Sequence, residues 1–456
     1  MSTGDFRRKT SRLSGRPEGP DLRAGRAFGG SATGRPEVGP YHANTRGIGK
    51  FSPDHSTARA AEIRVRLLPG RDRPVRRGSS WVFSGAVDGI DREAPAGAVA
   101  DVYAADGTWI AAGLWNPDAD LCVRVLTRDP GQTVGEDLLR ARIRSAAALR
   151  HDLYGTRADW TDTTAFRMLF SEADGLSGLV ADQYDGTLVL HVGGKAWVRW
   201  LPFLGPELKS ACGADTLVIR ADPDAVRREA LPEDLGGDEP PTEVAFRENG
   251  YCFFAQPSSG QKTGYYLDQR ENRRKVAALA RGRDVLSAYC YTGAFEVCAA
   301  HAGAKTVTGW DSSAPALSLA RRHQEANPGG TPVTYEEADV PTRLRQARDR
   351  RESWDLIILD PPRLVTSRAS LEKGLRAYKD INLLALKLLR PGGYLATFTC
   401  SGLVDADTFR TMLGWAAHDA SRTVRILSPL GPGPDHPISL DAPESDYLKG
   451  LLCRVD

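Results

Sequence analysis

The chain has 456 residues, of which 41% are hydrophobic and 26% charged, so it carries enough apolar material for buried cores and cannot be wholly disordered. This length predicts roughly three domains. The sequence has no run of about 20 apolar residues typical of a transmembrane helix, and its first residues lack the apolar stretch of a secretory signal. We therefore expect a cytoplasmic protein without a membrane anchor, and the net charge of +2 indicates no particular partner.

The cysteines predict free thiols and no metal site. Their number is odd, and neither a CxxC motif nor a Cys/His cluster with zinc spacing occurs. A reducing compartment keeps such thiols unpaired, so any one of them is available for chemistry. They lie at positions 122, 212, 252, 290, 298, 400 and 453.

Residues 1–60 are basic and poor in aliphatic side chains, with eleven Lys or Arg against five Asp or Glu. Such a segment buries too little apolar surface to offset its conformational entropy, which predicts a disordered basic arm. Two interpretations stay open: a solvated tail without a role, or an arm that binds nucleic-acid phosphates.

Ordered structure is expected from about residue 62 in two successive domains. Short strand-like runs separated by turn signals predict a small β-barrel over residues 62–135; they lie at 63–67, 81–84, 98–103, 109–114 and 121–126. A helix at 136–153, a helix at 198–211 and four strands predict a central α/β domain; the strands lie at 166–170, 179–183, 188–192 and 216–220. Residues 222–242 have the acidic, Pro- and Gly-rich composition of a linker that ends this domain at residue 243.

From residue 244 to 456 strands and helices alternate. The strands read as consecutive apolar residues, which is typical of a parallel sheet covered by helices on both faces. They are expected at 284–287, 306–310, 333–336, 355–359 and 394–399, with helices at 294–301, 314–326 and 378–389. The fold class is therefore α/β, preceded by a small β-barrel and a central α/β domain.

Acidic residues follow three successive strands of this sheet. Asp311 and Asp339 follow the second and third strands, and Asp360-Pro361 follows the fourth. Ligands bind beyond the carboxyl ends of such strands, where an acid can accept hydrogen bonds from a ribose diol. Each acid alone could equally cap the next helix, and Ser312 and Ser313 favour that interpretation for Asp311. The lack of a P-loop and of GxGxxG fits a nucleoside cofactor without phosphate, such as S-adenosylmethionine.

Cys400 follows the next strand and is expected to face the same crevice as Asp360. An isolated cysteine at a strand end is usually a small buried hydrophobe. Methylation at C5 of a pyrimidine, however, needs a thiolate to add at C6 and a group that manages protons. The spacing leaves both interpretations open. Methylation of an exocyclic amine is disfavoured, because Arg363 and Leu364 stand where an aromatic residue would stack on the base.

A series of ordered motifs resembles the bacterial family of S-adenosylmethionine-dependent large-subunit rRNA methyltransferases that make 5-methylcytosine. The resemblance covers residues 63–456. Its motifs are WVFSGA at 81–86, EADGLSGL at 172–179, GYYLDQR at 264–270, YTG at 291–293, DPP at 360–362, YKDIN at 378–382, TCSG at 399–402, DHP at 435–437 and YLKG at 447–450.

The resemblance implies a PUA RNA-binding domain, a central domain and a Rossmann-like class I methyltransferase domain. It implies Cys400 as nucleophile and Asp360 as its catalytic companion. It directs Tyr291, Thr292 and Gly293, then Asp311 with Ser312, then Asp339, at the methionine, ribose and adenine of S-adenosylmethionine. Large-subunit rRNA, free or in a subunit precursor, is the implied partner, and a homodimer is left open.

Residues 265–280 are expected to close the cofactor pocket. Residues 265–267 suggest a hairpin strand, and Asp268 with Glu271 suggests a capping pair for a helix from 273 to 280. That helix would bring Asp268 and Arg270 to the cofactor, although Arg270 could also be a surface charge. Asp360 and Pro361 after the fourth strand are also predicted cofactor-binding residues.

Three positions depart from the family pattern. Ser287 stands where an acid or Asn is frequent, Ala294 where a second glycine is usual, and Leu364 where an aromatic is usual. These changes leave contacts to the methionine end and base stacking open.

Arginines cluster in the barrel sequence beside two aromatic residues, Trp81 and Phe83. Cations interleaved with aromatics suit phosphate contacts and stacking on unpaired bases of RNA. The alternative is a solvated rim around a buried tryptophan. The candidate RNA-binding residues are Arg64, Arg66, Arg76, Arg77 and Trp81.

Two rival functions stay open. One is an RNA methyltransferase of another base specificity, such as guanine, with Cys400 as packing; only the thiol mechanism would trap RNA that contains 5-fluorocytosine. The other is a ribosome-assembly factor that binds S-adenosylmethionine without turnover, a hypothesis that Ser287 and Ala294 keep open.

Overall fold

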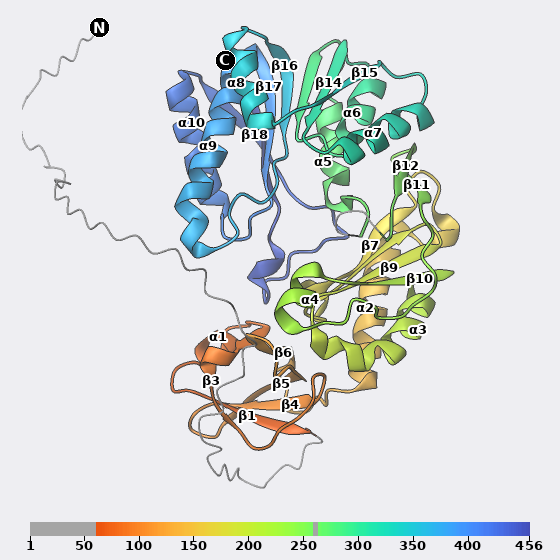
Figure 1. The fold of residues 1–456 in the computed structure, drawn as a ribbon, viewed down its shortest axis with the longest axis vertical. Coiled ribbons are helices and arrows are strands. Elements are labelled where there is room, and N and C mark those ends of the chain that lie inside the picture. The colour runs from red at the N-terminus through yellow and green to blue at the C-terminus, as the bar shows by residue number, and fades with distance from the viewer. Residues whose placement is uncertain (1–60, 259–262) are drawn as a thin grey trace, which may run out of the picture. The chain divides into compact units, whose positions relative to one another are not determined.

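The computed structural model describes residues 61–258 and 263–456; the predicted basic arm lies outside them. Two sheets of six and four strands, a two-stranded hairpin and a seven-stranded sheet organise this part of the chain (Figure 1). None of its helices is both long and apolar enough to cross a membrane.

The six-stranded sheet has the order β2-β6-β5-β4-β1-β3. In β1 the alternation is regular: Ile63, Val65 and Leu67 are fully buried, whereas Arg64 and Arg66 are half-buried. The five predicted strands are confirmed, and β3 and a short helix are added. The bounds are β1 Ile63–Leu67, α1 Arg73–Arg76, β2 Trp81–Phe83, β3 Val87–Ile90, β4 Val99–Tyr103, β5 Trp109–Trp115 and β6 Leu121–Thr127.

The four-stranded sheet has the order β10-β9-β8-β7, with α2 against β7 and α3 against β10. The bounds are α2 Glu136–Tyr154, β7 Ala165–Phe170, β8 Leu179–Tyr184, β9 Thr187–Val192, α3 Leu201–Cys212 and β10 Thr216–Ala221. All six elements were predicted.

The expectation that residues 222–242 form only a linker is wrong. They contain helix α4, Pro223–Glu229, which the Asp222 side chain caps by accepting the N–H groups of Asp224 and Ala225. Glu229 at its end is buried and accepts hydrogen bonds from the side chains of Asn116 and Arg124. The polar composition of this segment therefore serves a cap and a buried ionic contact.

The seven-stranded sheet has the order β15-β14-β13-β16-β17-β19-β18. β13 to β17 are parallel, and β19 is antiparallel to both β17 and β18. The strands are β13 Asp284–Ala288, β14 Thr306–Asp311, β15 Val333–Glu337, β16 Trp354–Leu359, β17 Leu389–Thr399, β18 Val424–Leu430 and β19 Lys449–Val455. The five predicted strands are confirmed.

Helices cover both faces of this sheet (Figure 1). Along β16, Leu356 and Ile358 join the core under α5 and α6, whereas Ile357 and Leu359 join the core under α8, α9 and α10. This two-sided burial explains the unbroken apolar run. The helices are α5 Arg270–Ala277, α6 Ala294–His301, α7 Ala314–Ala326, α8 Val340–Asp349, α9 Leu371–Leu388 and α10 Ala406–Ala420.

The segment before β13 differs from its prediction. The hairpin consists of β11 Val244–Glu248 and β12 Tyr251–Ala255, while Leu267–Gln269 form a 3-10 turn. Tyr265 and Leu267 are both buried, an i, i+2 pattern that imitates a strand. α5 begins at Arg270, and its N-cap Gln269 makes no side-chain cap bond, so the predicted Asp268–Glu271 capping pair is wrong.

Candidate active site

The strand order creates a crevice beside β13. From β13 the chain proceeds through β14 to β15 and then returns to β16 on the opposite side of β13. Ligands of such sheets bind at the carboxyl ends of the strands next to this reversal. The loops after β13, β14, β16 and β17 carry most of the predicted site residues.

Asp360 and Cys400 leave neighbouring strands, as predicted. β16 and β17 pair in parallel with Leu359 opposite Thr397, so Asp360 and Cys400 follow at the same edge. Both residues are half-buried, and the Cys400 Sγ lies 4.0 Å from the Pro361 carbonyl oxygen. The structure therefore brings the thiol next to the loop that Asp360 begins.

Tyr378 of α9 and Ser401 hold these two loops together. The Tyr378 hydroxyl lies 3.0 Å from the Ser401 Oγ and accepts the Leu364 N–H at 3.4 Å. The Ser401 Oγ also accepts the Val365 N–H at 3.3 Å. Because Ser401 directly follows Cys400, this network fixes the backbone from which the thiol projects.

Tyr266 lies among the reactive residues, and the sequence argument missed it. Burial raises the pKa of its phenol most, and the neighbouring Tyr291, Asp268, Asp360 and Cys400 raise it further. Its ring also meets the Tyr291 ring edge to face, with centroids 5.2 Å apart. Tyr266 thus lies between the loop after β13 and the Cys400 thiol, and its only sequence signal was the GYYLDQR motif.

Gln269 is a second missed residue. Its side-chain amide donates to the Asp360 carboxylate at 2.9 Å. The Asn272 amide donates to the Gln269 oxygen at 2.6 Å and to the Gly431 carbonyl at 2.9 Å. This chain of donors leaves the Gln269 nitrogen as the atom that faces Asp360, and it stabilises the ionised carboxylate.

The loop after β13 has an unusual backbone. Tyr289, Tyr291 and Gly293 all have positive φ, at 67°, 49° and 77°. This conformation strains a tyrosine, and strained residues of this kind collect at ligand sites. The Trp310 carbonyl at the end of β14 accepts the N–H groups of Tyr289 and Cys290 at 2.8 and 3.0 Å, which holds the strained turn.

Asp311 supports the same loop from β14. Its two carboxylate oxygens accept the N–H groups of Tyr291 at 2.8 Å and Ser313 at 2.9 Å. Ser313, and not Asp311, is the N-cap of α7, so the capping interpretation of Asp311 is wrong. Each oxygen keeps a further lone pair that can accept a ribose hydroxyl. Ser312 beside it is exposed.

Asp339 is exposed and caps α8, which is the structural role weighed for it. Its side chain accepts the Thr342 N–H at 3.1 Å, and this bond lowers the pKa of the carboxyl. Burial raises the pKa of the Tyr289 phenol, and the negative charge of Asp339 raises it further. Asp339 therefore lies close to Tyr289. Its position after β15 still leaves carboxylate lone pairs open to the crevice.

The three departures from the family pattern have distinct surroundings. Ser287 is buried beside Glu296, whose carboxyl is fully buried; burial raises the pKa of Glu296 to about 7, and the Ser287 hydroxyl lowers it in part. Ala294 is buried at the start of α6. Leu364 packs on the core beneath α9, so the aromatic ring near Cys400 is Tyr266 rather than residue 364.

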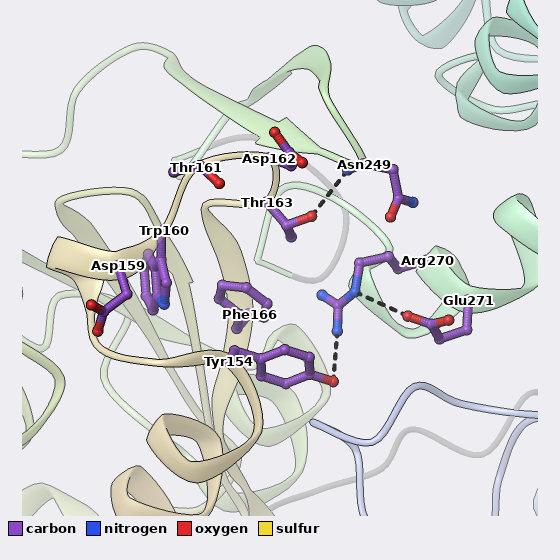
Figure 2. Close-up of a pocket in the computed structure, with 10 residues that line it drawn as sticks. All are labelled: Tyr154, Asp159, Trp160, Thr161, Asp162, Thr163, Phe166, Asn249, Arg270 and Glu271. Carbon is purple, nitrogen blue, oxygen red and sulfur yellow. Dashed lines mark hydrogen bonds and ion pairs between the residues drawn. The ribbon is translucent and has the colours of Figure 1, made fainter.

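The donors of Arg270 bind other groups of the protein. Its buried guanidinium forms an ion pair with Asp435 at 2.8 Å and donates to the Ala165 carbonyl at 3.0 Å and the Tyr154 hydroxyl at 3.2 Å. Figure 2 shows it at the edge of a cavity of about 220 Å³, facing Tyr154 and Glu271. Arg270 is thus not a surface charge, and its donors are engaged in tying α5 to the central sheet.

Asp268 is also buried and accepts a hydrogen bond from the Tyr447 hydroxyl. Its charge helps to raise the pKa of Tyr266, which places it on the reaction side of the crevice. A direct contact of Asp268 with the cofactor stays a prediction.

In the barrel, Trp81 is half-buried and less open to RNA than predicted. Its half-buried indole N–H donates to the Glu172 carboxylate at 3.0 Å and lies 3.2 Å from the Ser177 hydroxyl. Phe83, whose ring meets Trp81 edge to face, is 50% exposed instead. The alternative interpretation, a buried tryptophan under a solvated rim, therefore describes Trp81 better.

The candidate RNA-binding arginines lie on this rim. Arg76 and Arg77 are exposed, and Arg64 and Arg66 are half-buried. Arg66 pairs with Asp88 and Arg76 with Asp72, at 2.8 and 2.6 Å. Exposed ion pairs of this kind are weak and do not prevent contact with phosphate. No group of three or more His, Cys, Asp or Glu side chains in residues 61–258 and 263–456 could hold a metal ion.

Comparison with known proteins defines the class of this fold. The model of a PUA-like domain matches residues 65–128, and the model of an S-adenosylmethionine-dependent methyltransferase matches residues 212–440. A solved SAM-dependent methyltransferase fold from Streptococcus mutans covers 86% of this chain and 99% of its own, with a TM-score of 0.71 at 20% identity. A second methyltransferase structure, complexed with SAH, has a TM-score of 0.72 at 19% identity over the same shares. At these identities the solved structures establish the fold alone.

Curated relatives define the family. The protein of Shewanella denitrificans named ribosomal RNA large subunit methyltransferase I is 38% identical over 398 residues, which are 86% of this chain and 99% of that protein. The protein of the same name from Shewanella amazonensis is 39% identical over 400 residues. The chain belongs to this family of S-adenosylmethionine-dependent methyltransferases.

The residues at the crevice fit S-adenosylmethionine. Carboxylates that keep open lone pairs follow β14 and β15, and they match the ribose hydroxyls and the adenine amine, which are hydrogen-bond donors. The loop after β13, residues 289–293, lacks the several glycines of a phosphate-binding loop. This agrees with S-adenosylmethionine, which has no phosphate. The chemistry of this donor set therefore agrees with the cofactor of the family.

Proposed function

We propose that this enzyme makes 5-methylcytosine in large-subunit rRNA, with Cys400 as the nucleophile and Asp360 as the group that manages protons. One observation carries the proposal: the thiol and the carboxylate follow the paired strands β17 and β16, beside the strained Tyr291–Gly293 loop. The curated relatives are named for large-subunit rRNA, and this supports the substrate class.

The residues supply the chemistry that C5 of cytosine requires. The Cys400 thiolate adds to C6 while the pyrimidine ring takes up a proton, which makes C5 nucleophilic. Bound S-adenosylmethionine supplies an electrophilic methyl group. A base then removes the C5 proton, the C6–S bond breaks, and the electron pair returns to Cys400 as thiolate. Asp360 serves as proton donor and acceptor on the ring.

Two further residues tune this reaction side. The Gln269 amide donates to the Asp360 carboxylate at 2.9 Å and orients it, so that Asp360 can take the thiol proton of Cys400 and pass it to the ring. Tyr266 lies beside Cys400, Asp360 and Tyr291 and offers the aromatic surface that Leu364 lacks. We assign it the stacking contact with the target base.

On the cofactor side, the proposed contacts come from the loop and the strand-end acids. Tyr291, Thr292 and Gly293 take the methionine end, Asp311 with Ser312 the ribose, and Asp339 the adenine. Asp360 and Pro361 line the boundary with the reaction side. Arg270 is left out because its donors already bind Asp435, Ala165 and Tyr154.

RNA binding is assigned to the barrel rim. Arg64, Arg66, Arg76 and Arg77 provide phosphate contacts, and Phe83 replaces Trp81 as the exposed aromatic. Alanine at Arg76 and Arg77 should weaken RNA binding and flatten its salt dependence, since each lost phosphate contact lowers the salt slope by roughly one. We keep the division into residues 62–135, 136–243 and 244–456 and a cytoplasmic location as parts of this proposal.

Covalent trapping tests the mechanism. RNA that contains 5-fluorocytosine cannot lose a proton from C5, so the wild-type enzyme with S-adenosylmethionine should form an adduct that survives denaturing electrophoresis. Cys400→Ala should form none. Cys252→Ala is the matched control, because Cys252 is the other half-buried thiol among the described cysteines. An adduct with Cys400→Ala, or methyl transfer to another base, would overturn the proposal.

A further inference from the structure

His323 of α7 is a fully buried histidine that the proposed reaction does not use. Its Nδ1 lies 2.7 Å from the Thr292 carbonyl oxygen, and its Nε2 accepts the Phe254 N–H at 2.9 Å. A carbonyl can only accept, so the proton sits on Nδ1 and the tautomer is fixed. The imidazole thus connects the loop after β13 to strand β12.

We propose that His323 is a positioning residue for the cofactor, which sets the conformation of the Tyr291–Gly293 loop through the Thr292 carbonyl. The inference rests on the cofactor role assigned to this loop above. His323 is not among the residues proposed to contact the cofactor. Its role is to hold the backbone of the loop that does.

The peptide between Thr292 and Gly293 is held at both ends. His323 binds its carbonyl, and the Cys290 carbonyl accepts its N–H at 2.9 Å. On either side of Thr292 the backbone has positive φ, which is unfavourable for Tyr291. Without the imidazole the Thr292 carbonyl would be buried without a donor, and the strained turn would relax.

The surroundings of His323 keep it neutral. Burial lowers the pKa of the imidazole to about 4, although the Thr292 and Phe254 carbonyl oxygens, 2.7 Å from Nδ1 and 3.3 Å from Nε2, raise it in part. Phe253 meets the ring edge to face at 5.2 Å, and Phe254 stacks on it at 5.7 Å. The imidazole is therefore neutral at pH 7 and keeps its bonds to Thr292 and Phe254 there.

The same helix contains a natural control. Asn327, one turn further, pairs with β12 as His323 does: its amide donates to the Cys252 carbonyl at 2.7 Å and accepts the Cys252 N–H at 2.8 Å. Among residues 61–258 and 263–456, the hydrogen-bond partners of Asn327 are Cys252, His301, His323 and Gln324, and none lies in the Tyr291–Gly293 loop. Asn327→Ala removes these two bonds to β12 and the bond from the Asn327 amide to the His323 carbonyl at 2.7 Å, and it leaves the bond between the His323 ring and the Thr292 carbonyl in place.

Calorimetric binding of S-adenosylhomocysteine to the full chain tests the inference, with melting temperature measured in parallel. His323→Leu should weaken binding about tenfold or more, since a buried carbonyl loses its donor. Asn327→Ala should lower the melting temperature comparably and change the affinity less than about twofold. His323→Gln, which can both donate and accept, should recover much of the affinity.

Two results would overturn the inference. One is an unchanged affinity in His323→Leu; the other is an equal loss of affinity in Asn327→Ala at the same melting temperature. If His323→Leu does not fold, a comparison of His323→Asn with His323→Gln decides, because the shorter Asn amide cannot reach both Thr292 and Phe254. Faster exchange of the Gly293 amide and weaker binding in His323→Asn than in His323→Gln support the role, and equal exchange with equal affinity in the two variants contradicts it. Neither readout involves Cys400 or the base, so adduct trapping can fail or succeed independently.

Discussion

The two sides of the crevice are built differently. On the cofactor side, side chains hold a backbone: Asp311 binds the Tyr291 N–H and His323 binds the Thr292 carbonyl. On the reaction side, single side chains are positioned: the Gln269 amide donates to the Asp360 carboxylate, and the Tyr378–Ser401 contact fixes the loop from which Cys400 projects. Under the proposed function, binding of the cofactor is expected to depend on the shape of one turn, and turnover on individual functional groups.

This difference separates the expected effects of mutations. A change on the cofactor side should raise the dissociation constant for S-adenosylhomocysteine, because the turn loses its shape. A change on the reaction side should lower kcat and leave that constant nearly unchanged, because the groups act on the base. Each prediction below tests this separation.

The largest effect is expected at Asp360. Asp360→Asn keeps the volume and removes the proton acceptor, so kcat should fall by about 10²–10⁴-fold, with S-adenosylhomocysteine affinity within a few-fold. Asp339→Asn is the matched change on the cofactor side. It should weaken the affinity for S-adenosylhomocysteine, and kcat measured at saturating S-adenosylmethionine should equal that of the wild type. Kinetics at saturating cofactor and calorimetry measure both. The separation fails if Asp360→Asn is also rescued by cofactor.

Gly293→Ala should damage the cofactor side most. Gly293 has φ of 77°, and a Cβ there would collide with the Tyr335 hydroxyl and the Ala320 side chain. The strain should lower the free energy of unfolding by about 1–3 kcal/mol and weaken S-adenosylhomocysteine binding about tenfold. Gly402→Ala is the control, because a Cβ there meets open space. Equal affinities of the two variants would contradict the role of the turn.

Gln269→Leu tests the support of Asp360. Loss of a hydrogen bond to a charged group should reduce kcat about tenfold to a hundredfold without changing cofactor affinity. Gln269→Glu places a second carboxyl beside Asp360 and should raise the pKa of Asp360, which shifts the acidic limb of the kcat profile to higher pH. A pH profile identical to wild type in Gln269→Glu would show that the contact does not influence the reaction.

The smallest effect concerns pH. His323 has a pKa of about 4 in the folded protein against an ordinary value of 6.5, so the unfolded chain binds a proton first as pH falls. The stabilisation is complete above pH 6.5 and decreases towards pH 4, by about 1 kcal/mol at pH 5.5. Denaturant unfolding of wild type and His323→Gln measures it. Parallel curves for the two proteins between pH 7 and 5 would contradict the assignment.

The sequence predicted the parts of the site that depend on local pattern. Asp311, Asp360 and Cys400 each end an apolar run, and the parallel sheet brings these ends together. Because β16 and β17 are consecutive strands of the chain, the sequence also predicted that they lie side by side in the sheet. The conformation of the loop, with two tyrosines at positive φ, had no sequence signal beyond Gly293.

Long-range contacts explain the errors. Arg270 pairs with Asp435, 165 positions later, and Trp81 bonds Glu172 across domains, so charge and aromaticity alone suggested exposed or ligand-binding roles. Gln269 and Tyr266 precede the first strand of the sheet, and only the fold brings them to Asp360 and Cys400. A buried polar residue is informative only when its partner is known.

The most direct test of the central claim is transfer of labelled methyl from S-adenosylmethionine to large-subunit rRNA that lacks this modification, followed by nucleoside analysis, for wild type and Cys400→Ala. We predict label in 5-methylcytosine with the wild type and none with Cys400→Ala, although the variant still binds S-adenosylhomocysteine. Label in another nucleoside, or label in 5-methylcytosine that survives the substitution, would contradict the thiol mechanism.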